Sequence, residues 1–392
     1  MIRDRRATIA WLSVIALGWA ALAAIDPRLP HGAAALAARP WLVWQVTPII
    51  VIPMALATVW YVRGERRGAR ETSGRHFLFA AALLLLFLVL QSPIEGFSDQ
   101  FLTVHQVEHM TLDTIAPMLL LLAAPQAALL RGMPEWLRHR IVPRIMGHGV
   151  LHRTFAAISQ PVPASFLFVG ISDFWMIPSI HDASLRDPLV HELWHVTLFV
   201  SGLIFFFRLL DPRPAPLGAP LLTRMLMCWF AEMNAILFGF YLSFKSAVLY
   251  HAYGRMAPFW HVSALSDERF GGLTMWIPGS MMIALAAMVA LYRAASYEDR
   301  AAGRLALAAA ALPPRGRVFL AERQRANRAV AFGLTGFVGF VLIVAVIAAI
   351  LYDRTFSRER HLGAATTATA TALNSEATHV RREAPARREL SP

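Results

Sequence analysis

Two pairs of histidines with the same spacing are the clearest candidates for chemistry in this sequence. They are His105 and His109 in the stretch HQVEH, and His191 and His195 in the stretch HELWH. Residues four apart lie on one face of an α-helix, about one turn from each other, so each pair can offer two imidazoles to one ion. Neutral imidazole binds Cu, Zn, Fe and Ni. The spacing therefore predicts a metal site if the two pairs meet in the fold.

The histidine pairs stand at the starts of long apolar segments, which indicate membrane-spanning helices. Hydrophobic residues make up 57% of the 392 residues, more than in a soluble domain of ordinary composition. Runs of about 18 or more apolar residues are typical of transmembrane helices. We predict an all-α, polytopic transmembrane helical bundle with about nine spans and a seven-span core. The predicted spans are residues 8–25, 41–62, 76–91, 104–124, 162–180, 190–209, 222–244, 271–292 and 330–352.

Arginine-rich segments alternate with segments that hold few basic residues, and this alternation predicts the orientation of the helices. The rich segments are the N-terminus and residues 63–75, 131–162, 208–224 and 293–329. Short loops rich in Arg and Lys stay in the cytoplasm. We therefore expect a multi-pass protein of the bacterial inner (plasma) membrane with a cytoplasmic N-terminus. The net charge of +12 reflects this orientation, so we expect membrane lipid as a partner, and no nucleic acid.

This topology places both histidine pairs at the outer ends of two spans that run inward, where the four rings can share one metal ion. Further candidate ligands are Met110, Met275 and His181. Met110 follows the first pair, Met275 lies in the eighth predicted span, and His181 lies in the outer loop before the sixth. Thioether together with imidazole favours Cu(I). The alternative is a polar cluster whose hydrogen bonds hold the helices together.

Two other chemistries are compatible with single features of the sequence. HELWH matches H-E-x-x-H, in which two histidines bind zinc and the glutamate, here Glu192, is the general base of a metalloprotease. No separate motif for a third ligand accompanies it, and a protease does not explain the pair at residues 105–109. Two helices that each carry two histidines also suggest haem b, but a spacing of four residues leaves room for at most one haem.

Three stretches of the sequence have an order and spacing that can be compared with those of known families. They are HQVEHMTLDTIAPMLLLLAAPQAALLR (105–131), IPSIHDASLRDPLVHELWHVTLFVSGLIFF (177–206) and LSDERFGGLTMWIPGSMM (265–282). They resemble the conserved blocks of the CtaG family of assembly factors for caa3-type cytochrome c oxidase, over roughly residues 40–295. The sequence departs from the family at Asp267-Glu268, where Asp-Gln is common, and at His181, where an aromatic residue is common.

The resemblance implies assembly of cytochrome c oxidase and no catalytic activity of its own. It implies oxidase subunits as partners and copper as the metal handled at the outer face, with zinc or haem as the alternatives. The blocks also add Asp267 to the second group of candidate ligands. An assembly factor should hold metal reversibly, so we expect an accessible site with incomplete coordination rather than a closed four-ligand cage.

The composition divides the chain into five parts. Residues 1–39 hold an N-terminal helix and an outer loop, and residues 40–295 form the CtaG-like core. Residues 296–329 are a basic cytoplasmic segment, 330–352 a last transmembrane helix, and 353–392 a tail whose composition predicts disorder. The first span could instead be a signal peptide, although its apolar run is long for one. The single cysteine, Cys228, excludes an intrachain disulfide and any CxxC metal motif.

Overall fold

The computed structural model describes residues 47–68, 72–213, 218–253 and 261–309, together with a few isolated positions. These residues form helices, and no strand occurs among them, which confirms the all-α prediction for this part of the chain. The helices are α3 (Pro48–Arg66), α4 (Ser73–Gln91), α5 (Pro93–Ser98), α6 (Leu102–Met110), η2 (Thr111–Ile115), α7 (Ala116–Ala123), α8 (Gln126–Gly132), η3 (Leu137–Ile141), α9 (Val142–Met146), α10 (Gly149–Ile158), α11 (Pro161–Trp175), α12 (Pro178–Ser184), α13 (Pro188–Leu209), α14 (Leu221–Phe244) and α16 (Ala264–Ala309).

Among the described residues, four helices are long and apolar enough to cross a membrane. They are α4, α13, α14 and the first 38 residues of α16. The run from α6 to α7 joins α8 at a bend of 73°, and α10 joins α11 at a bend of 80°. If each bent pair is one span, the described chain has up to six spans. The predicted number of about nine is therefore not confirmed.

The difference in span number has identifiable sources. The predicted first span (8–25) lies outside the described residues, and so do nearly all of the ninth (330–352) and the tail. Helix α3 overlaps the predicted second span, but its last turn carries Arg63 and Arg66, and it is not among the candidate spans. Of the predicted basic segment 296–329, the structure describes the part up to Ala309, which continues helix α16.

The predicted fifth span ends earlier than the sequence suggested. Helix α11 ends at Trp175, and Pro178 begins the short helix α12. Proline fits the first turn of a helix but cannot continue one, and it disfavours helical backbone at the residue before it. Pro178 therefore divides the predicted span 162–180 and places His181 on a separate helix.

The helix that carries the first histidine pair widens directly after it. Residues Thr111–Ile115 form a π-helical turn between α6 and α7. Pro117, at the start of α7, has no N–H to donate to the carbonyl of Asp113 four residues earlier. Single π-helical turns relieve such interruptions and are frequent at functional sites. The turn leaves the Asp113 carbonyl on the surface of this helix, where α13 packs.

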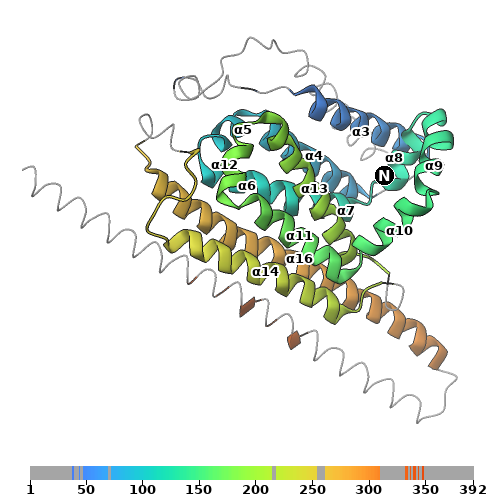
Figure 1. Cartoon of the computed structure of the whole chain (residues 1–392). Coiled ribbons are helices and arrows are strands. Elements are labelled where there is room, and N and C mark those ends of the chain that lie inside the picture. The colour runs from blue at the N-terminus through green and yellow to red at the C-terminus, as the bar shows by residue number, and fades with distance from the viewer. Residues whose placement is uncertain are drawn as a thin grey trace, which may run out of the picture. The chain divides into compact units, whose positions relative to one another are not determined.

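Helices α14 and α16 lie side by side along one face of the unit Met1–Gly339, which contains the helices described above (Figure 1). Two glycines permit their close approach. A Cβ atom at Gly272 would lie 2.7 Å from the Gly239 carbonyl, and one at Gly239 would lie 2.7 Å from the Trp276 Cβ. Small residues at membrane helix interfaces allow such contacts between backbones. Helices α5, α6 and α12 gather at one end of this unit (Figure 1).

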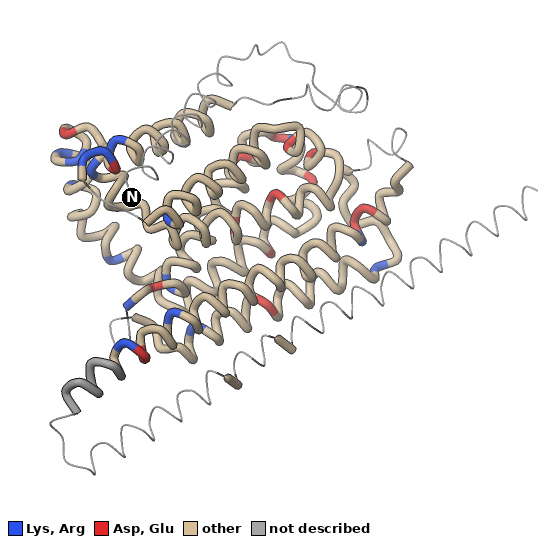
Figure 2. Tube along the Cα trace, turned by 180° about the vertical axis from the view of Figure 1, so that it is seen from behind, with Lys and Arg blue, Asp and Glu red and all other residues tan. Residues whose placement is uncertain are grey.

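Charged residues are distributed unequally between the two ends of these helices. Figure 2 shows most Lys and Arg residues at the end opposite to the acidic residues near α5 and α6. At the basic end, Arg293 donates to the Leu210 carbonyl (2.7 Å), and Arg224 donates to the Asp211 carbonyl (2.6 Å). These arginines therefore also satisfy carbonyls at the C-terminal end of α13.

Candidate metal centre

The two histidine pairs meet in the structure. His105 and His109 project from α6, and His191 and His195 from α13. The ring centroids of His105 and His191 are 5.3 Å apart, and those of His109 and His195 are 6.1 Å apart. Within the pairs the centroids are 4.1 Å and 4.4 Å apart, as expected for neighbours one helical turn apart.

Three of the four rings form one compact group of ligands. Ligand nitrogens of His105, His109 and His195 all lie within 4.8 Å of one another, and all three side chains are buried. In the described part of the chain, Nε2 of His105, Nε2 of His109 and Nδ1 of His195 have no hydrogen-bond partner. Buried polar atoms are rarely left unpaired, because losing their water costs free energy. We call these three residues the imidazole triad; its orphaned nitrogens fit a bound metal ion.

His181 lies beside the triad and connects to it through a tyrosine. The Tyr253 hydroxyl is 2.6 Å from Nε2 of His181 and 2.6 Å from Nδ1 of His105. Burial lowers the pKa of His181 to about 3, so its ring is neutral at neutral pH. In one tautomer, His105 Nδ1–H donates to the hydroxyl and the hydroxyl donates to His181. Nε2 of His105 then keeps its lone pair, and the ring is oriented for a metal.

A carboxylate also lies beside the triad, that of Glu108 in the HQVEH motif. Oε1 of Glu108 lies 3.0 Å from Nε2 of His195, and both residues are buried. Carboxylates beside metal-binding imidazoles orient the ring and make it a stronger ligand. Glu192, the acidic residue of HELWH, is only partly buried and is absent from the described metal-binding groups.

A tryptophan closes the space between the rings. Trp194 is fully buried, with ring centroids 4.3 Å from His109, 4.9 Å from His105 and 4.7 Å from His181. It stacks on Trp175 of α11 at 5.3 Å and an interplanar angle of 11°. These indoles shield one side of the triad from water, and a drier site strengthens electrostatic interactions within it.

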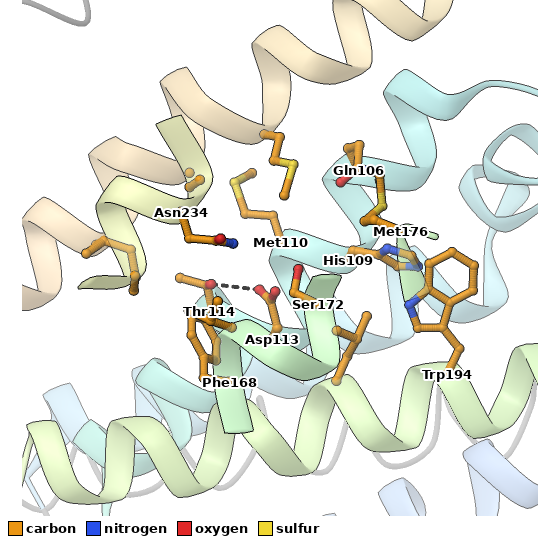
Figure 3. A pocket seen from close by; sticks show the side chains of 17 residues that line it. Gln106, His109, Met110, Asp113, Thr114, Phe168, Ser172, Met176, Trp194 and Asn234 are labelled. Atoms are coloured by element: carbon orange, nitrogen blue, oxygen red, sulfur yellow. Dashed lines mark hydrogen bonds between the residues drawn. The ribbon is translucent and has the colours of Figure 1, made fainter. Parts of the chain in front are cut away.

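The predicted methionines Met110 and Met275 lie beside a cavity that His109 also lines. Met110, Met275 and Met176 line a cavity of about 70 Å³ together with His109. Figure 3 shows the side chain of Met176 beside the His109 ring and that of Met110 nearer to Asn234. Asp113 lines the same cavity and accepts a hydrogen bond from the Thr114 hydroxyl (2.7 Å). Thioethers therefore stand next to the triad rather than within it.

Close packing of α13 against η2 brings His195 to the first pair. A Cβ atom at Gly202 would lie 2.0 Å from the Asp113 carbonyl oxygen, so only glycine fits here. The N-terminus of α13 is fixed by Asp187, whose Oδ1 accepts a hydrogen bond from the Leu189 amide (2.9 Å). Pro188 occupies the first helical turn, where it needs no N–H partner.

Asp267 is placed as a helix cap. Its Oδ2 accepts from the Leu102 amide (2.6 Å) and its Oδ1 from the Thr103 amide (3.1 Å), at the N-terminus of α6. Carboxylates stabilise helix N-termini by pairing these free amides and by opposing the helix dipole. Asp267 belongs to neither metal-binding group found in the described residues.

Replacing Asp267 by alanine should lower stability by about 0.5–2 kcal/mol, the usual cost of a lost cap. The midpoint of thermal unfolding of the detergent-solubilised protein measures the change. Asp267→Asn keeps one acceptor oxygen and should lose less. A variant with normal thermal stability but no bound metal would instead place Asp267 among the ligands.

Glu268, the next residue, holds the segment that carries Tyr253. Its carboxylate forms an ion pair with Lys245 and accepts hydrogen bonds from the amides of Leu249 (2.9 Å) and Tyr250 (2.7 Å). The Tyr250 hydroxyl in turn donates to the Met176 carbonyl (2.8 Å). The loop after α14 is therefore tied to α16 and to the end of α11, which fixes Tyr253 between two histidines.

Sequence reasoning missed three side chains at this end of the bundle. Tyr253 carried no signal, because its loop has no periodic pattern. Glu95 and Asp99 lie four residues apart shortly before the first histidine pair, which is a ligand spacing. They form a second group with His191, in which the ligand atoms all lie within 4.8 Å of one another.

Comparisons with known proteins agree with the resemblance seen in the motifs. Residues 55–296 match the family model described as cytochrome c oxidase caa3 assembly factor (Caa3_CtaG). An uncharacterised protein of Mycobacterium leprae is 24% identical over 283 residues, which are 68% of this chain and 41% of the relative. One from Mycobacterium bovis is 26% identical over 288 residues, 67% of this chain and 42% of the relative. The chain thus spans about two fifths of these relatives. No solved structure gives a significant match.

Proposed function

This chain belongs to the family of cytochrome c oxidase caa3 assembly factors, and we propose that it binds copper at the imidazole triad for delivery to the oxidase. The observation that carries the proposal is the triad itself. Three buried imidazoles from two helices converge, and each has a nitrogen without a hydrogen-bond partner among the described residues. A polar cluster that only held the helices together would pair these nitrogens with one another or with neighbouring groups.

The donor set favours copper over harder metals. Imidazole suits Cu, Zn, Fe and Ni, and nearby thioethers select Cu(I). The cavity next to His109 adds Met110, Met176 and Met275 as soft donors. A Cu(I) ion held by the triad would therefore have thioethers as neighbouring donors.

The triad also fits reversible binding. Three protein ligands leave a coordination position open, which an incoming donor from a partner can occupy. Glu108 and Tyr253 would hold the His195 and His105 rings in place while the metal enters and leaves. The protein's part is then to orient ligands and exclude water, and no catalytic step is required.

We place the triad at the outer face of a bacterial inner membrane. Among the described residues, most Lys and Arg lie at the opposite end of the helices from the acidic residues near the triad (Figure 2). Basic loops remain cytoplasmic, so this distribution supports an outward-facing site and a cytoplasmic N-terminus. Oxidase subunits are the partners that we propose at this face.

Titration of the purified, metal-free protein with Cu(I) against a chromophoric chelator tests the proposal. We expect one Cu(I) per chain. His109→Ala removes a ligand and should weaken binding by at least about 100-fold, the upper effect of losing an outer-shell partner. His148→Ala is the matched control, because His148 is an exposed histidine at the start of α10. Cu(I) binding by His109→Ala at wild-type affinity would contradict the proposal.

The same preparation separates the alternative functions. An absorption spectrum with a Soret band would support a haem b protein instead. The zinc protease gains less support from the geometry, because His195 groups with His105 and His109, whereas His191 groups with Glu95 and Asp99. Peptide cleavage that is lost in Glu192→Gln would nevertheless favour it.

A further inference from the structure

A second group of ligands stands beside the imidazole triad. Glu95 lies in α5, Asp99 is the residue that ends this helix, and His191 lies in the first turn of α13. One ligand atom from each lies within 4.8 Å of the other two. Oδ1 of Asp99 is 4.0 Å from Nδ1 of His191. Elements far apart in the sequence therefore bring two carboxylates and one imidazole to one point.

Two atoms of this group are buried without a partner. Glu95 is 8% exposed, and its Oε2 has no hydrogen-bond partner in the described structure. Nε2 of His191 is in the same situation. A buried carboxylate oxygen that is left unpaired destabilises the fold or forces the group to neutralise. These atoms are therefore free to take a ligand that the described side chains do not supply.

The charges around Glu95 point to a cation. The groups near enough to act on Glu95 electrostatically include the carboxylates of Glu108, Asp99 and Glu192. Carboxylates this close repel each other unless a proton or a metal ion lies between them. His191 supplies a neutral donor to such an ion.

We propose that Glu95, Asp99 and His191 form a second metal site, which binds a divalent cation such as Zn²⁺ next to the imidazole triad. Two oxygens and one imidazole nitrogen are harder donors than three imidazoles with nearby thioethers, so this site should reject Cu(I). The Asp99 side chain is 36% exposed, which gives an ion access from the surface. This inference goes beyond the proposed copper function and does not depend on it.

Glu108 joins the two sites. Its carboxylate acts on Glu95 electrostatically, and its Oε1 lies 3.0 Å from Nε2 of His195. His191 and His195 are also neighbours on α13, with ring centroids 4.4 Å apart. Ions in the two sites would be close enough to influence each other's binding.

Zn²⁺ titration of the purified full-length protein tests the inference. We expect two Zn²⁺ per chain in the wild type, because imidazoles also bind zinc. The double variant Glu95→Gln with Asp99→Asn should lose one of them and still bind one Cu(I). The double variant His105→Ala with His109→Ala should keep one Zn²⁺ and lose Cu(I). Glu192→Gln is the control, since it removes a nearby carboxylate that belongs to neither group.

The outcomes distinguish this inference from the copper proposal. Equal Zn²⁺ binding by wild type and the Glu95→Gln, Asp99→Asn variant would overturn the second site, whatever Cu(I) does. Loss of one Zn²⁺ in that variant, with no Cu(I) bound by any protein, would uphold the second site and reject the copper proposal. If the double variant does not fold, Asp99→Ala provides the test of the second site, because replacing the partly exposed Asp99 side chain should not disturb the fold. It should bind the same ion at least tenfold more weakly.

Discussion

Cells that carry His105→Ala together with His195→Ala are expected to assemble cytochrome c oxidase that lacks most of its copper. Each substitution removes one ligand of the triad, and the two come from different helices, so a single imidazole remains. One imidazole cannot hold copper against competing cellular ligands, and the affinity should fall by at least about 100-fold. Copper per oxidase, measured on the purified complex from mutant and wild-type cells, gives the readout.

Two controls separate loss of copper from loss of the protein. The amount of the double variant in the membrane fraction should equal that of the wild type, since removing two buried imidazoles leaves Trp194 buried and Gly202 packed against η2. His148→Ala should leave the oxidase fully loaded, because this side chain is exposed. Normal copper in oxidase from the double variant would show that the triad does not deliver it.

Substituting Gly202 by alanine is expected to weaken folding and metal binding together. The new Cβ would lie 2.0 Å from the Asp113 carbonyl oxygen, which is backbone and cannot rotate away. Helix α13 must then move from η2, at a cost of about 1–3 kcal/mol or more. The same displacement would pull His195 from His105 and His109, so metal binding should weaken together with stability. Thermal unfolding and Cu(I) titration of the solubilised variant measure the two effects.

Gly170→Ala is the matched control for this substitution. Gly170 is also in a helix, α11, but a Cβ atom there meets nothing within 4 Å. Alanine is a better helix former than glycine, so this variant should be more stable by about 0.5–1 kcal/mol. A Gly202→Ala protein as stable as the wild type would mean that α13 and η2 do not pack as closely as described.

The sequence by itself predicted the long apolar helices and the spacing of the two histidine pairs. Apolar run length and the spacing of four residues are local properties, and they identified α4, α13, α14 and α16 as well as the two histidine pairs. The motif blocks also identified the family, which the match over residues 55–296 confirms. The bends after Ala123 and Ile158 were not predicted, because the hydropathy of an apolar run is the same whether or not the helix axis bends.

Only the tertiary structure decided how the histidines are shared. The site of four rings stays a prediction; in the structure the ligand atoms of His105, His109 and His195 lie within 4.8 Å of one another, and those of His191 lie as close to Glu95 and Asp99. That division depends on the distance between α6 and α13. This distance is set where Gly202 packs against the Asp113 carbonyl, which Pro117 leaves without a helical hydrogen bond. Asp267 likewise becomes a helix cap only because α16 passes the N-terminus of α6. Spacing along a chain fixes which side chains share a helix face, but packing between helices decides which of them meet.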